Sequence, residues 1–231
     1  MIDDKRIVVI IPAYNEEESL SLVLSEIPKF VDEIIVANNG STDKTFEVAM
    51  NAGITVVNEN EKGYGAACLK AMEKIKDENF DIVVFLDGDY SDFPEEMNQV
   101  VEPIINNNYD LVIGSRMMGS KEKGAMLPQA KFGNWLASLL IKLFWKYKFT
   151  DLGPFRAIKY SSLLKLNMQD RNYGWTVEMQ IKAAKQKLKT TEVPISYRKR
   201  IGQSKVTGTF KGTMKASLKI PYLIFVSLFR N

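Results

Sequence analysis

Residues Asp81–Asp89 read DIVVFLDGD, and this short stretch carries both a fold signal and a chemical signal. Five apolar residues in a row, most of them β-branched or aromatic, are typical of a strand buried on both faces of a parallel sheet. Two carboxylates, Asp87 and Asp89, follow the strand with one glycine between them. Because ligands of an open parallel sheet bind beyond the carboxyl ends of its strands, these side chains are candidates for a site.

The alternation of buried strand and helix repeats on both sides of this stretch. Strands are expected at 7–11, 33–37, 54–57 and 110–113, with helices at 16–27, 43–51, 63–76 and 94–106. This pattern predicts an α/β fold, a mostly parallel central sheet with helices on both faces. Further helices are expected at 129–146 and 175–187, with a strand at 190–195 and a final apolar helix. We expect one domain over residues 1–210 and a C-terminal helical extension over 211–231.

The composition limits the chemistry of the protein. Its 231 residues include 31 Lys+Arg and 28 Asp+Glu, and a net charge of +3 is too small to indicate a nucleic-acid partner. One cysteine and no histidine exclude an internal disulfide framework, a histidine general base and a histidine-containing zinc site. Metal chemistry must rest on carboxylates, which suit Mg²⁺ or Mn²⁺, and phosphate binding must rest on Lys and Arg.

Polar residues follow three other expected strands at the same edge of the sheet. They are the segments 12–17 (PAYNEE), 38–43 (NNGSTD) and 114–116 (GSR). Each segment alone is compatible with a turn or a helix cap, but their gathering at one edge favours a site. The two carboxylates of the DGD segment lie so close that they need a cation or solvent between them. The segment is therefore either a metal site or a solvated Asp-Gly turn.

The motifs IIPAYNEE, NNGSTDKT, ENEKGYGAA, FLDGDYSDFPEE and VIGSR, in this order, resemble a family 2 glycosyltransferase of the GT-A type nucleotide-binding fold. The nearer resemblance is to polyprenyl-phosphate sugar transferases such as dolichol-phosphate mannosyltransferase. It continues through DLGPFRAI, YGWTVEMQIKAA, EVPISYRKR and IGQSK, and so covers the chain from Ile7 to about Lys205. The resemblance implies an inverting, metal-dependent transfer of a sugar from a GDP- or UDP-sugar to a polyprenyl or dolichyl phosphate.

The resemblance also implies roles for individual residues. The nucleotide would be bound by Pro12, Ala13, Tyr14, Glu16, Asn38, Lys62, Asp87 and Gly88. The metal, Mg²⁺ or Mn²⁺, would be bound by Asp87, Asp89 and Ser91. The acceptor phosphate would be bound by Arg116, Lys131 and Ser204. The catalytic residues would be Asp87, Asp89, Arg116, Arg200 and Lys205. The basic stretch 197–205 would close over the diphosphate. The alternative interpretation is that this stretch is a run of charged residues exposed to solvent.

The chain departs from the family pattern just before Gly40. Relatives usually carry two acidic residues there, one of which accepts a hydrogen bond from the nucleobase, whereas this chain has Asn38 and Asn39. An asparagine amide both accepts and donates hydrogen bonds, so the choice between uracil and guanine stays open on sequence alone.

The absence of histidine bears on the acceptor. A hydroxyl acceptor needs a general base, which here would be a carboxylate such as Asp151 or Glu178. A phosphate monoester has a second pKa of about 6 and is already anionic near pH 7, so it needs only positioning and charge compensation. The sequence is consistent with a phosphate acceptor and leaves a soluble saccharide or protein acceptor open.

Two other classes of protein share part of this pattern. A sugar-phosphate nucleotidyltransferase has a similar sheet and acidic metal site but normally carries a glycine-rich loop after its first strand, and residues 12–17 contain no glycine. A non-catalytic nucleotide-sugar-binding module is disfavoured because Asp87, Asp89 and Arg116 are all present.

Two segments are strongly apolar, 135–149 (WLASLLIKLFWKYKF) and 216–229 (ASLKIPYLIFVSLF). Neither reaches the ~20 apolar residues that cross a bilayer, and the acidic N-terminus predicts no secretory signal. Aromatic and aliphatic residues mixed with lysines are typical of helices in a membrane interface, and also of core helices whose lysines extend to solvent. We expect a cytoplasmic protein that is peripheral at the cytoplasmic face of a membrane.

Overall fold

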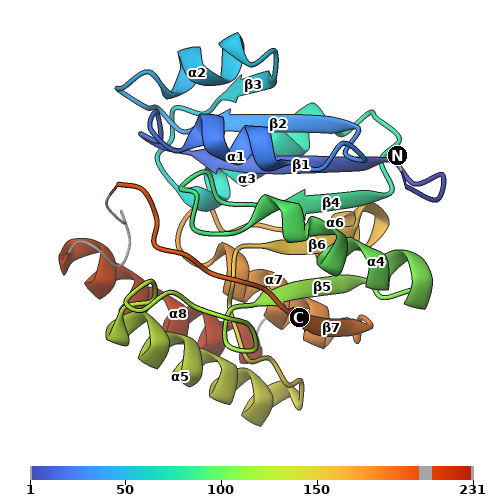
Figure 1. Ribbon diagram of the computed structural model, residues 1–231. Helices are drawn as coiled ribbons and strands as arrows, with labels where there is room; N and C mark the ends of the chain where they lie inside the picture. The colour runs from blue at the N-terminus through green and yellow to red at the C-terminus, as the bar shows by residue number, and fades with distance from the viewer. Residues whose placement is uncertain (1, 203–209, 230–231) are drawn as a thin grey trace.

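The computed structural model describes residues 2–202 and 210–229. Its centre is a seven-stranded sheet in the order β3-β2-β1-β4-β6-β5-β7 (Figure 1). The strands are β1 (Ile7–Ala13), β2 (Glu33–Asn38), β3 (Thr55–Asn58), β4 (Ile82–Phe85), β5 (Leu111–Ser115), β6 (Arg156–Lys159) and β7 (Thr190–Pro194). All strand pairs are parallel except the two that β6 forms with β4 and β5. The mostly parallel α/β architecture predicted from the sequence is confirmed.

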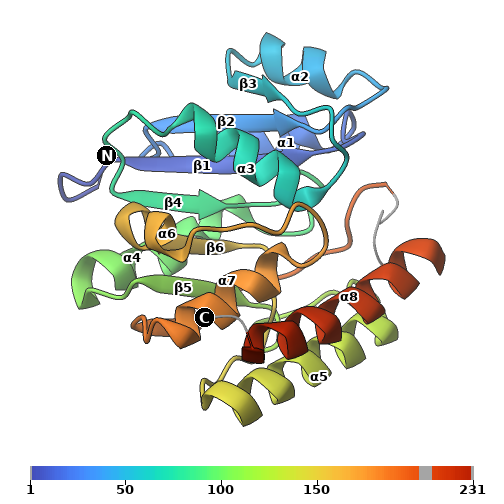
Figure 2. The same cartoon turned by 180° about the vertical axis from the view of Figure 1, so that it is seen from behind.

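Helices cover both faces of this sheet (Figures 1 and 2). One face packs against α1 (Leu20–Glu26), α2 (Thr45–Asn51), the short 3₁₀ helix η1 (Pro94–Glu96) and α4 (Met97–Asn107). The other face packs against α3 (Tyr64–Lys74), α6 (Tyr160–Leu166) and α7 (Trp175–Lys185). Along β1, Ile7, Val9 and Ile11 enter the first core and Val8 and Ile10 enter the second. This alternation explains why the strand is apolar at every position.

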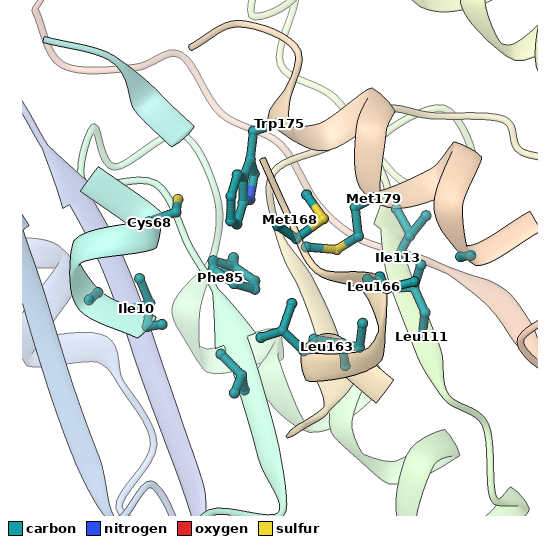
Figure 3. Close-up of a cluster of buried hydrophobic side chains, with 14 of the residues drawn as sticks. Ile10, Cys68, Phe85, Leu111, Ile113, Leu163, Leu166, Met168, Trp175 and Met179 are labelled. Carbon is teal, nitrogen blue, oxygen red and sulfur yellow. The ribbon is translucent and has the colours of Figure 1, made fainter. Parts of the chain in front are cut away.

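The second core supports the strand that leads to the acidic residues (Figure 3). Phe85, the last residue of β4, packs edge to face on Trp175 with 5.8 Å between ring centroids. Trp175 is 1% exposed, and Met168 and Met179 lie in the same cluster. These bulky side chains fix the end of β4 two residues before Asp87, which makes them structural residues.

Strand β6 and helix α6 were not predicted from the sequence. β6 lies between β4 and β5 and runs antiparallel to both, and its first residue, Arg156, pairs with Phe85 and with Ile113. The segment that precedes β6 therefore lies at the carboxyl ends of the neighbouring strands. A buried arginine in a strand of four residues interrupts the apolar pattern by which strands are recognised.

The helix expected from Glu16 begins only at Leu20. The backbone N–H of Asn15 donates to the Ser41 hydroxyl at 3.1 Å, and that of Glu16 donates to the Thr45 hydroxyl at 2.8 Å. These side chains fix residues 15 and 16 at the start of a turn. The Leu20 N–H then donates to Glu16 O at 2.9 Å, so one isolated helical turn precedes α1.

Helices α5 (Pro128–Trp145) and α8 (Phe210–Phe229) lie side by side at the β7 end of the sheet (Figures 1 and 2). The rings of Phe144 and Phe225 meet with 6.0 Å between centroids. Lys219 of α8 forms an ion pair of 2.9 Å with the buried carboxylate of Asp170, before α7. No helix among the described residues is long and apolar enough to cross a membrane. The division into two domains at residue 210 stays a prediction.

The start of α3 packs tightly on residues 170–172, so a substitution there provides a test of the fold. A Cβ atom added at Gly65 would lie 1.9 Å from the carbonyl oxygen of Asp170. Gly65→Ala is therefore expected to lower the free energy of unfolding by about 1–3 kcal/mol, measured by urea denaturation. In the control Gly133→Ala the added atom meets nothing within 4 Å, so stability should be unchanged or higher by up to ~1 kcal/mol. Equal effects of the two substitutions would contradict this packing.

Candidate active site

The polar segments predicted from the sequence meet at the carboxyl edge of β1, β2, β4 and β5, where β6 begins. Asp87 and Asp89 lie at the centre of this edge. Burial, together with the nearby negative charge of Asp89, raises the pKa of Asp87 to about 7. The Asp87 Oδ1 atom is buried and has no hydrogen-bond partner among the described residues. This carboxylate is therefore held in a position where its charged form is poorly compensated.

Asp89 is 5% exposed and is fully engaged by the protein. Its Oδ1 atom accepts hydrogen bonds from the backbone N–H of Ser91 at 2.9 Å and from the Ser91 hydroxyl at 2.5 Å. Its Oδ2 atom lies 2.9 Å from Nη1 of Arg200. Ser91 and Arg200 therefore both contact Asp89, and Ser91 orients its carboxylate, while the metal-binding role of Ser91 and the catalytic role of Arg200 stay predictions.

Arg200 reaches the edge on the basic segment, which we define as residues 197–202. Its Nη2 atom donates to Glu16 Oε1 at 3.0 Å, so one guanidinium bridges Glu16 and Asp89. The backbone of the basic segment is fixed by hydrogen bonds from Arg198 N to Ser91 O at 2.9 Å and from Ile201 N to Asp89 O at 3.0 Å. The segment lies directly over the acidic loop, and Arg200 is not part of a solvated run of charges.

Arg116 is paired with Asp151, which lies in the segment just before β6, at the carboxyl edge of the sheet. Its Nε atom donates to Asp151 Oδ2 at 2.8 Å and its Nη2 atom to Oδ1 at 2.7 Å. Burial alone would raise the pKa of Asp151, but the Arg116 guanidinium holds that pKa below its usual range. Two guanidinium nitrogens are thereby occupied, and Nη1 has no hydrogen bond to another described residue, so it can donate to an anion.

The two carboxylates considered as general bases, Asp151 and Glu178, both form ion pairs within the protein. Asp151 is 0% exposed and forms the ion pair with Arg116. Glu178, on α7, accepts hydrogen bonds from the backbone N–H groups of Gln169 and Asp170 and pairs with Lys182 at 2.7 Å. Neither is placed to remove a proton at the edge.

The remaining predicted residues divide into those near the edge and those away from it. Tyr14 and Lys62 contact each other, with 2.9 Å from Lys62 Nζ to the Tyr14 hydroxyl. Ala13 and Asn38 pair across β1 and β2, as do Pro12 and Ala37. The Gly88 carbonyl accepts a hydrogen bond from Ser19. A hollow of ≈ 230 Å³ adjoins Glu16 and Arg200, lined by Asn15–Ser19, Asp43, Ile201 and Gly202.

Lys131 is the predicted phosphate ligand that the structure does not join to the others. It lies in the first turn of α5 with its side chain exposed, and no described contact connects it to Arg116. Ser204 and Lys205 lie outside the described residues, so their assigned roles stay predictions.

Asp92 is a residue that the sequence reasoning missed. It is 2% exposed, and neither carboxylate oxygen has a hydrogen-bond partner among the described residues. Burial and the negative charge of Asp87 raise the pKa of Asp92 well above its usual range. The third acidic residue in DGDYSD was the available signal, but nothing in the sequence showed that it is buried.

The acidic loop suits a divalent cation that is shared with an anionic ligand. The described residues contain no group of three or more acidic or sulfur ligands that could hold a metal alone. Asp87 Oδ1 is unpartnered, and Mg²⁺ typically takes one or two carboxylates plus phosphate oxygens and water. A cation there would favour the ionised form of Asp87 and lower its pKa. Asp87 and Asp89 are the residues that would hold it.

Paired carboxylates and two arginines from later segments thus share one edge of an α/β sheet, an arrangement that suits an anionic ligand shared with a cation. Residues 8–166 match the family model described as Glycosyl transferase family 2. The chain belongs to this family and is a glycosyltransferase.

Three relatives are named as transferases that act on dolichyl or undecaprenyl phosphate. The chain is 33% identical over 214 residues to a UDP-N-acetylglucosamine–dolichyl-phosphate N-acetylglucosaminyltransferase of Methanococcus voltae, covering 83% of this chain and 85% of that one. It is 29% identical over 220 residues to an undecaprenyl-phosphate mannosyltransferase of Micrococcus luteus, covering 90% of each. A dolichyl-phosphate hexose transferase of Haloferax volcanii is 31% identical over 204 residues, covering 86% of this chain and 85% of that one.

A solved structure supports the fold. Glucosyl-3-phosphoglycerate synthase of Mycobacterium tuberculosis, in complex with Mn²⁺, UDP and glucosyl-3-phosphoglycerate, superimposes with a TM-score of 0.78. The match covers 99% of this chain and 81% of that one at 21% identity, which confirms the GT-A type fold.

The ion pair of Arg116 and Asp151 is expected to matter for stability. Asp151→Ala would leave a guanidinium whose side chain is only 14% exposed without its counter-charge, at a cost of about 3–5 kcal/mol in urea denaturation. The double variant Arg116→Met with Asp151→Leu should regain most of that loss. In the control Glu73→Ala, which breaks an exposed helix pair with Lys70, little change is expected. A single variant as stable as the parent would refute the importance of the pair.

Proposed function

We propose that this glycosyltransferase moves a sugar, with inversion, from a nucleotide-diphosphate sugar to a polyprenyl phosphate, with Mg²⁺ or Mn²⁺ as cofactor. The observation that carries the proposal is the pairing of Arg116 with Asp151 beside the acidic loop. It provides a fixed cation for an anionic acceptor, and it occupies Asp151, one of the two carboxylates considered as a base. The names of the relatives support the same acceptor class.

The donor diphosphate is assigned to the acidic loop. Mg²⁺ or Mn²⁺ held by Asp87 and Asp89 would stabilise the negative charge that develops on the leaving diphosphate. Arg200 now bridges Glu16 and Asp89 and lies within reach of the same space. When a diphosphate enters, the guanidinium can donate to phosphate oxygens, which are stronger partners for a planar bidentate donor. Arg200 therefore binds the donor in this proposal.

The acceptor needs no general base if it is a phosphate monoester, because its oxygen is already anionic near pH 7. Arg116 Nη1 is the group that would orient it. Met117 and Met118 follow Arg116 directly and are 41% and 51% exposed, so an apolar chain attached to the phosphate meets apolar side chains next to the site. A soluble sugar acceptor gains nothing from these methionines.

A membrane surface is proposed as the location of that acceptor. Along α5, Phe132, Trp135 and Leu143 are 62%, 56% and 67% exposed. On the adjacent α8, Phe225 is 50% and Phe229 87% exposed. We name the exposed apolar side chains of α5 and α8 the apolar face. Lysines flank the α5 part of this face, and such a combination binds the interface of anionic membranes. The assignment to the cytoplasmic side stays a prediction.

The proposed reaction is tested by incubating the protein with radiolabelled nucleotide sugar and polyprenyl phosphate, then extracting with organic solvent. We expect label in the organic phase in Mn²⁺ and its loss in EDTA. Asp89→Asn should lower the rate by about 100-fold or more, because it removes charge from the diphosphate site. Asn60→Asp, in an exposed loop, is a control that should keep the full rate. Label that enters only water-soluble products would overturn the lipid acceptor.

Membrane binding is tested separately by flotation with liposomes that contain anionic lipid. We expect the protein to float at low salt, and the double variant Phe132→Ser with Trp135→Ser to remain in the soluble fraction, because each substitution removes an exposed ring. Met50→Ser is the control, since Met50 is 52% exposed on the distant helix α2. Parent protein that stays soluble with and without lipid acceptor would exclude the interfacial role.

A further inference from the structure

We propose that Arg198 is a positioning residue of the donor site, which fixes the basic segment on the acidic loop, residues 87–93, and thereby holds Arg200 at the diphosphate. The inference rests on the proposed function, because it names what positions a ligand-binding residue of the same site. It follows from the different ways in which the protein binds two arginines that are two residues apart in one segment.

The basic segment runs between two loops and is hydrogen-bonded to both. On one side, the Arg198 N–H donates to the Ser91 carbonyl at 2.9 Å, and Tyr197 pairs with Asp92 as in an antiparallel sheet. On the other side, the Tyr197 N–H donates to the Ser120 carbonyl at 2.9 Å. These backbone bonds set the direction of the segment, but any residue except proline can form them. They therefore do not account for an arginine at position 198.

The side chain of Arg198 adds contacts that only an arginine can make together. Its Nε atom donates to the Tyr90 carbonyl at 2.8 Å, and its Nη2 atom donates to the Asp92 carbonyl at 3.1 Å and to Glu26 Oε2 at 2.7 Å. Its Cζ atom lies 3.3 Å from the centre of the Tyr90 ring and 4.1 Å from that of Phe93. A planar guanidinium stacks on rings and donates from its edge at the same time, which a lysine ammonium cannot do. We name Arg198, Glu26, Tyr90 and Phe93 the Arg198 cluster.

Glu26 ties the Arg198 cluster to the core of the protein. It is the last residue of α1, whose Leu20 and Val23 side chains are buried. Burial alone would raise the pKa of Glu26, but hydrogen bonds from the Tyr90 hydroxyl and from Arg198 lower it, so this carboxylate is charged at neutral pH. The basic segment is thereby fixed to a helix that packs on the sheet, and not only to another loop.

The backbone of Tyr90 indicates that the acidic loop is shaped to receive Arg198. Its φ is 63°, in the left-handed region that a bulky residue rarely adopts, and such a conformation persists only where the surrounding contacts hold it. The carbonyl and the ring of Tyr90 both contact Arg198, and its hydroxyl donates to Glu26. The contacts that offset the unfavourable backbone are therefore those of the Arg198 cluster.

Arg200 is bound in the opposite way. Its guanidinium pairs with Glu16 at 3.0 Å and with Asp89 at 2.9 Å, and both carboxylates belong to the proposed donor site. Its Nε atom is buried and has no hydrogen-bond partner among the described residues. When a diphosphate enters, these bonds can be exchanged for bonds to phosphate oxygens while Arg198 still holds the segment. Arg198 is therefore the fixed arginine and Arg200 the exchangeable one.

The test is isothermal titration calorimetry of the full chain with UDP and with GDP in excess Mn²⁺, followed for the nucleotide that the parent binds more tightly. Arg198→Ala should weaken this binding by about tenfold, because Arg200 is no longer held over the acidic loop. Arg198→Lys keeps the charge but loses the stacking and the fork of donors, so it should weaken binding by at least about threefold. In the matched control Arg6→Ala, affinity should stay unchanged, because Arg6 also lies over a ring, that of Phe80 at 4.6 Å, but precedes β1 at the opposite edge of the sheet.

A double-mutant cycle separates positioning from a general loss of structure. Arg200→Ala alone should weaken nucleotide binding by about tenfold. If Arg198 acts through Arg200, adding Arg198→Ala should weaken binding by no more than about twofold further, whereas independent effects would multiply. Urea denaturation of each variant checks that the chain is folded.

Glu26→Gln provides a milder variant, because it removes the charge and keeps a hydrogen-bond acceptor for Arg198. It should weaken nucleotide binding by about threefold in the parent and leave it unchanged in Arg200→Ala. Parent-like affinity of Arg198→Ala or of Arg198→Lys, or effects of positions 198 and 200 that multiply, overturn the positioning role and leave the transferase intact. Failure of the parent to bind either nucleotide overturns the proposed function itself.

Discussion

Repulsion among carboxylates is the physical constraint that determines which side chains gather at the carboxyl edge of the sheet. Asp87, Asp89 and Asp92 lie within one short loop, and Glu16 reaches the same loop from the first strand. Arg200 offsets part of this repulsion by bridging Glu16 and Asp89. The rest appears as raised pKa values of Asp87 and Asp92, for which burial is the largest cause and neighbouring carboxylates contribute. The position of the basic segment over the acidic loop therefore compensates charge that the loop alone leaves unpaired. The site is assembled by residues separated by up to 184 positions in the chain.

The antiparallel strand β6 places the carboxylate that pairs with the second arginine of the site, Arg116. Because β6 runs against its neighbours, the residues before it, including Asp151, arrive at the carboxyl edge, where Arg116 has just left β5. Arg156 secures this turn from within, since its guanidinium donates to the backbone carbonyls of Leu152, Gly153 and Thr176. The result is that two arginines from distant parts of the chain, Arg116 and Arg200, are each held by a carboxylate at the same edge of the sheet.

The sequence patterns predicted those features that depend on neighbouring residues in the chain. The parallel strands were recognisable because each is apolar on both faces, and the acidic loop because two carboxylates follow such a strand. β6 and α6 were missed because Arg156 in a strand contradicts the apolar pattern, and only the carbonyls around it explain its burial. The pairing of Arg116 with Asp151, the bridge made by Arg200 and the burial of Asp92 depend on which distant segments meet. The sequence contains no local signal for such contacts.

Water proton relaxation in the presence of Mn²⁺ tests most directly whether the acidic loop takes up a cation together with a diphosphate. Mn²⁺ accelerates this relaxation strongly when it is bound to a slowly tumbling protein. With protein alone we expect little enhancement, because Arg200 already pairs with Asp89 and the described residues offer no third acidic ligand. Addition of a nucleoside diphosphate should produce a large enhancement, which Asp89→Asn should abolish. Equal enhancement with and without the nucleotide, or none in either case, would contradict a shared metal and diphosphate site.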